Sequence, residues 1–354
     1  MKNFFRIVAL TSFSFLSCGE NDEPTISAQP YNLIVPYTLD QFLTPMEIPE
    51  DNPLTVEGVA LGRKLFFDPI LSNNESQACA TCHLPEASFS DENPTSLGVD
   101  GIAGQRNSMA IINLGYTKRL FWDGRSNSLE AQAFLPVTDP VEMHESWPNV
   151  ESKLANHEVY PQLFQEAFGN IAIDSTLVSK AIAQFERTLL SGNSAFDKYL
   201  EGRPTGWNTA DFDLALAGFE VFMSEEKGDC FHCHGDKFNP LWTDNLFHNN
   251  GLDTELEDFG LGNVSNNASD KGKFKTPTLR NLLFTAPYMH DGRFESLEEV
   301  IEHYSTGLKP SSTIDPLMKR VSDGGVNLTA ADKASLLMFL KSLTDSSFVA
   351  PPMR

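Results

Sequence analysis

Two short stretches decide the interpretation of this 354-residue chain: Cys79-Ala80-Thr81-Cys82-His83 and Cys230-Phe231-His232-Cys233-His234. Both have the pattern Cys-x-x-Cys-His, which is typical of covalent c-type haem attachment. The two sulfurs bond to one edge of the porphyrin, and the adjacent histidine ligates the iron. Cysteines at this spacing could also bind zinc or form disulfides. Because both motifs end in histidine and together use four of the five cysteines, the sequence predicts two covalent c-type haems.

The fifth cysteine belongs to an export signal. Lys2 and Arg6 precede an apolar run over residues 7–16, which is too short to span a bilayer. The run leads into Leu16-Ser17-Cys18, which resembles a lipobox. We predict a signal peptide over residues 1–17 and lipidation of Cys18, with an ordinary signal peptide as the alternative. Since c-type haems are attached outside the cytoplasmic membrane, we expect an exported protein: periplasmic, or anchored at the outer membrane through its lipid alone.

Charge and composition limit the partners of the protein. Residues 18–38 contain acidic residues and prolines, which predicts a tether. The formal net charge of the whole chain is −22. This charge argues against nucleic acid as a partner, because phosphates repel acidic surfaces. It suits a small redox protein with a basic face, although acidity also simply keeps an exported protein soluble.

The chain looks internally duplicated. Trp122-Asp123-Gly124-Arg125 and then Ser128-Leu129-Glu130 follow the first motif, and His290-Asp291-Gly292-Arg293 and then Ser296-Leu297-Glu298 follow the second. A helical pattern precedes each motif, over residues 56–67 and 209–223. The sequence therefore predicts a mainly α fold with two cytochrome-c-like domains, one over residues 39–204 and one over residues 205–354, each holding one haem.

Further segments carry a resemblance to a known family. They are Arg187-Thr188-Leu189-Leu190-Ser191-Gly192, residues 121–125 and 139–143, and Thr278-Leu279-Arg280-Asn281 before Pro287-Tyr288. With both haem motifs in register, the chain resembles the bacterial di-haem cytochrome c peroxidases, a family that includes the MauG enzymes. The resemblance implies a peroxidatic N-terminal haem domain and an electron-transferring C-terminal one.

Peroxide chemistry requires particular side chains around an open iron. A carboxylate must move a proton between the two peroxide oxygens, a neutral donor helps to orient peroxide, and an aromatic group couples the haems. The resemblance assigns these roles to Glu142, Gln132 and Trp122, which keep the family's spacing of ten residues. Taken singly, each could be an ordinary core or surface residue. Glu130 is a rival carboxylate, but its counterpart Glu298 in the duplicate suggests a structural role.

The resemblance also implies a calcium ion between the domains. Asn107, fifteen residues before Trp122, matches the asparagine that the family uses as a ligand. The remaining protein ligands would be backbone carbonyls around Lys275 and Pro277. Calcium readily accepts such oxygen ligands, although an asparagine at this position could instead cap a turn.

One departure from the family concerns the first haem. Many relatives carry a loop histidine that blocks the peroxide site at rest, and that position here is Val99. His144 is the nearest other histidine, but it follows Glu142 closely rather than lying in the blocking loop. We therefore expect the first haem to be open at rest.

A second departure concerns the sixth ligand of the second haem. The peroxidases use a methionine where this chain has Tyr304, and the MauG branch uses tyrosine. A phenolate would favour ferric iron and lower its potential. His303, Met289 and Met318 are the alternative ligands if Tyr304 is only a packed aromatic residue.

Three functions fit these observations. The first is reduction of hydrogen peroxide with electrons from a small cytochrome c or a cupredoxin. The second is a MauG-like oxidation of a partner protein with peroxide equivalents. The third is plain electron transfer without an enzymatic reaction, which Glu142, Gln132 and the open first haem disfavour.

Overall fold

The computed structural model describes residues 28–169 and 172–349. The predicted signal peptide, Cys18 and the first part of the tether lie outside these ranges, so their assignments stay predictions. In the described ranges no helix is both long enough and apolar enough to cross a membrane.

The first half of the molecule is built on two helices that pack against each other. Its helices are α1 (Tyr37–Phe42), α2 (Val56–Phe67), α3 (Cys79–Cys82), α4 (Leu129–Thr138), α5 (Trp147–Ala155), α6 (Tyr160–Phe168) and α7 (Ser175–Glu186). The Thr55 side chain caps α2 by accepting from the Gly58 amide. Helix α7 crosses α2 at Gly62, where a Cβ atom would lie only 1.8 Å from the Ala181 carbonyl oxygen. Glycine at this position therefore lets the two backbones touch.

The second half repeats this arrangement. Its elements are α8 (Ala195–Leu200), α9 (Thr209–Met223), α10 (Phe231–His234), β1 (Phe247–His248), α11 (Leu261–Ser265), β2 (Phe274–Lys275), α12 (Leu297–Thr306), α13 (Ala330–Ser342) and α14 (Ser346–Val349). Helix α13 crosses α9 at Gly218, where a Cβ atom would lie 1.9 Å from the Ser335 carbonyl oxygen. The paired glycines show that the duplication extends from the motifs to the helix packing.

Each half also contains the same turn before its inner helix. Leu120 bridges to Ser126 in the first half, and Tyr288 bridges to Phe294 in the second. Serine side chains then cap both helices: Ser128 accepts from the Ala131 amide in α4, and Ser296 accepts from the Glu299 amide in α12. The duplicated sequence therefore folds into duplicated local structure.

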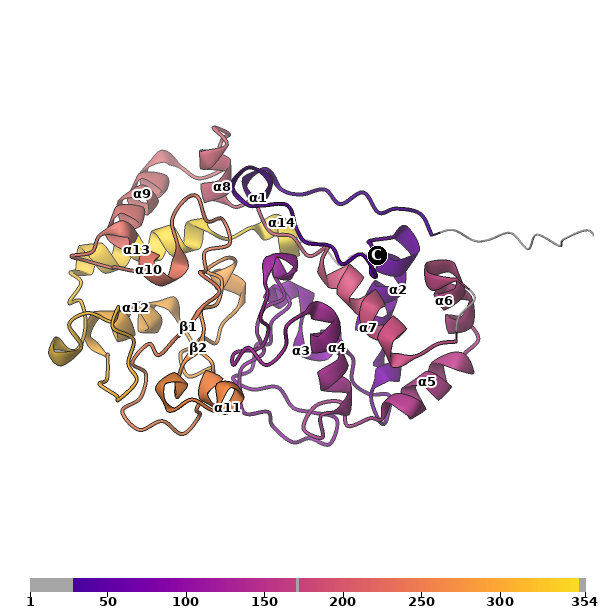
Figure 1. The fold of residues 1–354 in the computed structure, drawn as a ribbon. Helices are drawn as coiled ribbons and strands as arrows, with labels where there is room; N and C mark the ends of the chain where they lie inside the picture. The colour runs from indigo at the N-terminus through magenta and orange to yellow at the C-terminus, as the bar shows by residue number, and fades with distance from the viewer. Residues whose placement is uncertain (1–27, 170–171, 350–354) are drawn as a thin grey trace, which may run out of the picture.

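The structure confirms the predicted mainly helical fold. In the described ranges the two short strands β1 and β2 form one antiparallel pair, with Phe247 opposite Lys275. They lie between the two groups of helices (Figure 1). The two larger clusters of buried hydrophobic residues fill one half each, and Ala195 and Phe196 belong to the cluster of the second half. The domain boundary near residue 205 stays a prediction.

Polar contacts join the halves tightly. The Lys275 amide donates to the Trp122 carbonyl oxygen at 2.8 Å. The Arg106 guanidinium bridges Asp123 of the first half and Asp258 of the second, with both nitrogen–oxygen distances at 2.7 Å. The wall between the halves is therefore ordered by buried and half-buried hydrogen bonds.

Candidate active site

The first Cys-x-x-Cys-His motif lines a cavity in the first half. Helix α3 carries Cys79 and Cys82, and His83 follows at its end. The His83 Nδ1 lies 2.9 Å from the Phe89 carbonyl oxygen, so this nitrogen must carry the proton and donate. The other ring nitrogen, Nε2, is left to ligate a metal. A backbone acceptor on the second nitrogen is the usual way in which proteins orient a ligating histidine.

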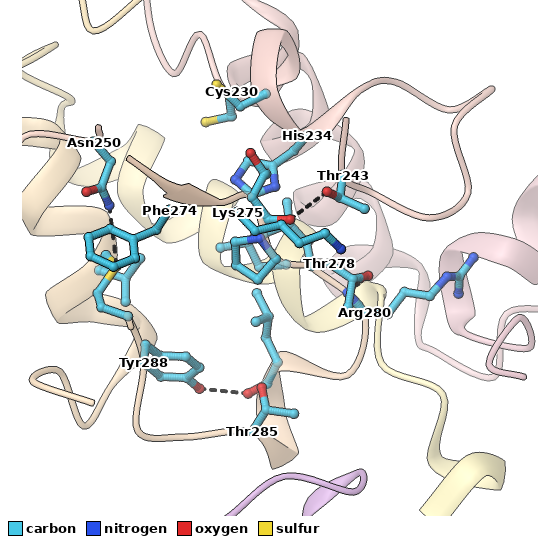
Figure 2. Close-up of a pocket in the computed structure, with 18 of the residues that line it drawn as sticks. Cys230, His234, Thr243, Asn250, Phe274, Lys275, Thr278, Arg280, Thr285 and Tyr288 are labelled. Atoms are coloured by element: carbon cyan, nitrogen blue, oxygen red, sulfur yellow. Dashed lines mark hydrogen bonds between the residues drawn. The ribbon is translucent and has the colours of Figure 1, made fainter. Parts of the chain in front are cut away.

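The second motif lines a cavity in the second half (Figure 2). The His234 Nδ1 lies 3.2 Å from the Trp242 carbonyl oxygen, which repeats the arrangement of His83. Cys230 and Cys233 are free thiols, as are the two cysteines of the first motif. Four unpaired cysteines and two oriented histidines, each set beside its own cavity, fit two covalent haems. They do not fit the alternative of disulfides within these motifs.

Glu142 lies in the turn that follows α4 and lines the first cavity together with His83. Burial of the side chain raises the pKa of Glu142 to about 6, and the nearby negative charge of Asp139 adds to this rise. The positive charge of Arg125 opposes it. A carboxyl group with a pKa near 6 can both accept and release a proton near neutral pH.

Gln132 and Trp122 line the same cavity. Gln132 projects from α4, one turn after the capping serine. Trp122 also lines the second cavity, and its indole Nε1 donates to the Asn107 carbonyl oxygen at 2.8 Å. The structure therefore brings together all three side chains that the sequence singles out, with Trp122 in the wall that the two cavities share.

The rival residues point elsewhere. Glu130 accepts from both terminal nitrogens of Arg187, at 2.7 and 3.1 Å, and from Asn52 at 2.6 Å. His144 is half exposed and its Nδ1 lies 2.5 Å from an Asp100 carboxylate oxygen. Val99 donates its amide to the Glu142 carbonyl oxygen at 2.8 Å. Among the described residues that line the first cavity, His83 is the single histidine.

The predicted calcium ligands lie at the shared wall. Asn107 is buried, and Asn107, Lys275 and Trp122 line both cavities, while Pro277 lines the second. The amide nitrogen of Asn107 donates to the carbonyl oxygens of residues 93 and 94, at 3.2 and 3.3 Å. No hydrogen bond within the described ranges uses its Oδ1 atom. That oxygen is therefore available to a cation.

Three of the predicted candidates for a further iron ligand, Tyr304, Met289 and Met318, line the second cavity. The Asn250 side-chain nitrogen donates to the Tyr304 hydroxyl at 3.2 Å and to the Met289 sulfur at 3.6 Å. Burial raises the pKa of Tyr304 to about 12, so the phenol is neutral without a metal. His303 is not among the lining residues, and its Nε2 lies 3.1 Å from the Asn250 carbonyl oxygen.

Sequence reasoning missed two ionisable groups at the cavities. Glu186, the last residue of α7, is buried beside the first cavity, and its Oε2 has no hydrogen-bond partner. Burial raises the pKa of Glu186 to about 8. The second group is the ammonium of Lys275, whose pKa burial lowers to about 8. Glu186 directly precedes the Arg187 motif, but a buried acid cannot be told from a surface one by spacing alone.

Comparison with known proteins shows which family the chain resembles. A family model described as di-haem cytochrome c peroxidase matches residues 56–205. The methylamine utilization protein MauG of Methylophilus methylotrophus is 34% identical over 306 residues, which cover 86% of this chain and 88% of that protein. Cytochrome-c peroxidase IdrP1 of Pseudomonas sp. (strain SCT) is 32% identical over 336 residues, covering 86% of this chain and 85% of that protein.

A solved structure gives the same result. The crystal structure of a MauG-like protein associated with microbial copper homeostasis superposes with a TM-score of 0.79 at 32% identity. The match covers 91% of this chain and 98% of the other.

A mainly helical fold with a Cys-x-x-Cys-His motif beside a cavity in each half is the arrangement expected of a di-haem protein. The chain belongs to the di-haem cytochrome c peroxidase and MauG family. The predicted family and the predicted enzyme class, an oxidoreductase of the peroxidase type, are thereby confirmed. Membership also implies the two predicted haems.

Proposed function

We propose that the protein reduces hydrogen peroxide to water in the first cavity, with electrons that arrive through the second. The observation that carries this proposal is Glu142, a half-buried carboxyl group whose pKa is raised to about 6 beside the haem-binding His83. A plain electron-transfer cytochrome has no use for such a group.

The haem held by Cys79, Cys82 and His83 would supply an iron that binds peroxide and passes electrons to it. The Glu142 carboxylate would accept the proton of one oxygen of bound peroxide and deliver it to the other oxygen, which then leaves as water. Two electrons from the donor protein and two protons from solvent would convert the remaining oxygen to a second water. The Gln132 amide donates a hydrogen bond that orients peroxide. Trp122, which lines both cavities, couples the two haem sites.

The proposal includes an electron donor and a cellular location for the protein. The strongly acidic chain suits a small cytochrome c or cupredoxin with a basic docking face. We further propose export to the periplasm or an anchor at the outer membrane through Cys18. Related cytochrome-c peroxidases, among them the cytochrome c551 peroxidase of Nitrosomonas europaea, support a cytochrome donor.

A MauG-like reaction on a partner protein is the second candidate function. Tyr304 favours it, because a tyrosinate ligand on the second haem would stabilise oxidised iron. The 34% identity to MauG supports it as well. In both functions His234 and Tyr304 would be the residues that hold the second iron.

We also propose a calcium ion at the shared wall, held by the Asn107 Oδ1 and by the carbonyl oxygens of Lys275 and Pro277. The unpartnered Asn107 oxygen supports this site. Chelation with EGTA should remove one calcium per protein and change the electron exchange between haems, and added calcium should restore it. A protein without calcium by elemental analysis, unaffected by EGTA, would contradict the site.

Stopped-flow mixing of the diferric protein with hydrogen peroxide tests the main proposal. The absorption spectrum should change at once, without prior reduction, because no histidine other than His83 lines the first cavity in the described ranges. Addition of a reduced cytochrome c or cupredoxin should then return the resting spectrum and oxidise the donor. A protein that ignores peroxide until it is half-reduced would instead require a blocking ligand, with His144 as the first suspect.

Electron paramagnetic resonance tests the ligands of the second haem. Untreated protein should show one high-spin and one low-spin ferric haem. Tyr304→Phe should change only the low-spin signal, and the matched control Met289→Leu should leave it unchanged. If Met289→Leu changes the signal and Tyr304→Phe does not, methionine is the ligand and the MauG-like candidate loses its support.

A further inference from the structure

One buried cation at the wall between the cavities forms no hydrogen bond or ion pair with a described residue, and the negative charge of Asp244 acts on it only from a distance. The residue Lys275 is only 5% exposed. In the described ranges neither a hydrogen bond nor an ion pair engages its Nζ atom. The other deeply buried cations are neutralised: Arg187 pairs with Glu130 at 2.7 Å, and Arg280 pairs with Asp197 at 2.8 Å. Lys275 is therefore exceptional within this fold.

The position of Lys275 is fixed by its backbone. It ends β2, opposite Phe247, and its amide donates to the Trp122 carbonyl oxygen at 2.8 Å. Its side chain lines both cavities (the second is shown in Figure 2, together with His234). The ammonium thus stands where the two haem cavities approach each other.

An unpaired buried ammonium is strongly unfavourable, so a negative group must compensate for it when the protein is complete. Every haem carries two propionate side chains, and each is a carboxylate at neutral pH. A calcium ion at the same wall could not neutralise the ammonium, because both are positive. The haems are therefore the natural source of the missing negative charge.

We propose that Lys275 is a positioning residue whose ammonium forms an ion pair with a haem propionate at the wall between the two cavities. The ion pair would fix the rotation of that haem within its cavity and place a positive charge next to the redox centre. This inference rests on the presence of two haems and not on the proposed peroxide reaction, so either can fail without the other.

A positive charge beside a haem favours the ferrous state, because ferric haem carries one more positive charge. Loss of the ammonium should therefore lower the midpoint potential of the haem whose propionate it holds. It should also change the propionate vibrations of that haem, which report hydrogen bonding and ion pairing of the carboxylate directly.

The test compares Lys275→Met with Lys273→Met in the complete di-haem protein, with calcium kept constant. Lys273 lies two residues away in the same segment, but its Nζ pairs with Asp270 at 3.0 Å. Spectroelectrochemical titration should show a lowered potential for one haem in Lys275→Met and unchanged potentials in Lys273→Met. Resonance Raman spectra should show altered propionate bands in Lys275→Met alone. Unchanged potentials and unchanged propionate bands in Lys275→Met would overturn the proposal.

If Lys275→Met does not incorporate haem, its potential cannot be measured. Lys275→Arg and Lys275→Gln are then compared instead. The charged arginine should restore haem content and a near-normal potential, whereas the neutral glutamine should not. Equal recovery by arginine and glutamine would mean that a polar side chain suffices, and the ion pair would be rejected.

Discussion

The two halves of the molecule present different side chains from the same scaffold. When Ser128-Leu129-Glu130 is aligned with Ser296-Leu297-Glu298, Pro136 in α4 matches Tyr304 in α12. Both residues line the cavity of their own half. Proline has no atom that can ligate iron, whereas the tyrosine hydroxyl can. At this aligned position the first cavity is lined by a residue that cannot ligate iron, and the second cavity is lined by a candidate ligand.

The same alignment shows that the two halves also differ in their polar side chains. Gln132 matches Val300, and Glu142, in the turn after α4, matches Pro310. At these two aligned positions the first half has a hydrogen-bond donor and a carboxyl group and the second half has neither, although both halves orient a haem-binding histidine in the same way. Duplication supplies two haem sites, and a few side chains make them chemically unequal.

The largest expected effect is the loss of turnover in Glu142→Gln. Removal of a general acid–base group costs roughly 10²–10⁴-fold in rate. Both haem spectra should stay intact, because the variant keeps the size of the side chain. The control is Glu145→Gln in the same turn, whose side chain pairs with Lys153 outside the cavity. Steady-state peroxide turnover should fall in the first variant alone, and equal turnover in both would remove Glu142 from the mechanism.

The next effect compares the buried ion pairs of the two halves. Burial by itself would raise the pKa of Asp197, but the charge and hydrogen bonds of Arg280 hold it well below its usual range. Arg280→Met should destabilise the protein by about 3–5 kcal/mol, because it leaves a buried carboxylate unpaired. Arg187→Met should cost less, since its partner Glu130 is partly exposed. Urea unfolding of the haem-loaded variants measures both values, and the reverse order would contradict the argument.

The helix crossings provide a third test of the duplication. Gly62→Ala and Gly218→Ala should each destabilise the fold by roughly 1–3 kcal/mol, since the added carbon would collide with a backbone carbonyl oxygen. Gly104→Ala is the control, because the nearest atom to its new Cβ would be 3.6 Å away. Thermal unfolding should show similar losses for the two crossing glycines. A loss in only one half would mean that the halves tolerate separation of their helices differently.

The smallest effect is the pH dependence of turnover. Only the deprotonated Glu142 accepts a proton, and its pKa is about 6, so turnover should rise as the pH increases through 6. The rate at pH 5 should be about tenfold below its plateau. Asp139→Asn removes a negative charge that raises this pKa, and should therefore move the rise to lower pH. A profile that is flat from pH 5 to 8 in both proteins would show that another step limits turnover.

The sequence predicts the haem motifs, the helix caps and the helices, because each of these depends on residues close together in the chain. The haem motifs, the capping serines at Ser128 and Ser296 and the helical spacing before each motif all act over a few residues. The side chains of Trp122, Gln132 and Glu142 could be assigned only through a family resemblance. The partnerless Lys275 ammonium and the unpaired Glu186 oxygen could not be foreseen, because burial and missing partners arise from segments far apart in the chain.

The return of the chain to its first half has a consequence for electron flow. After α13 the backbone comes back, and the Asp345 carboxylate accepts from the amides of Gly192 and Asn193 at 3.1 and 2.9 Å. Phe348 then stacks edge-on against Phe89, beside the first haem motif. The second half is thus connected to the first at both of its ends: by the chain at its start, and by these contacts at its end. Electron tunnelling weakens exponentially with distance. Because both ends of the second half are held, the distance between the two haem sites would stay fixed while partner proteins bind and dissociate, and so would the rate of electron exchange between the haems.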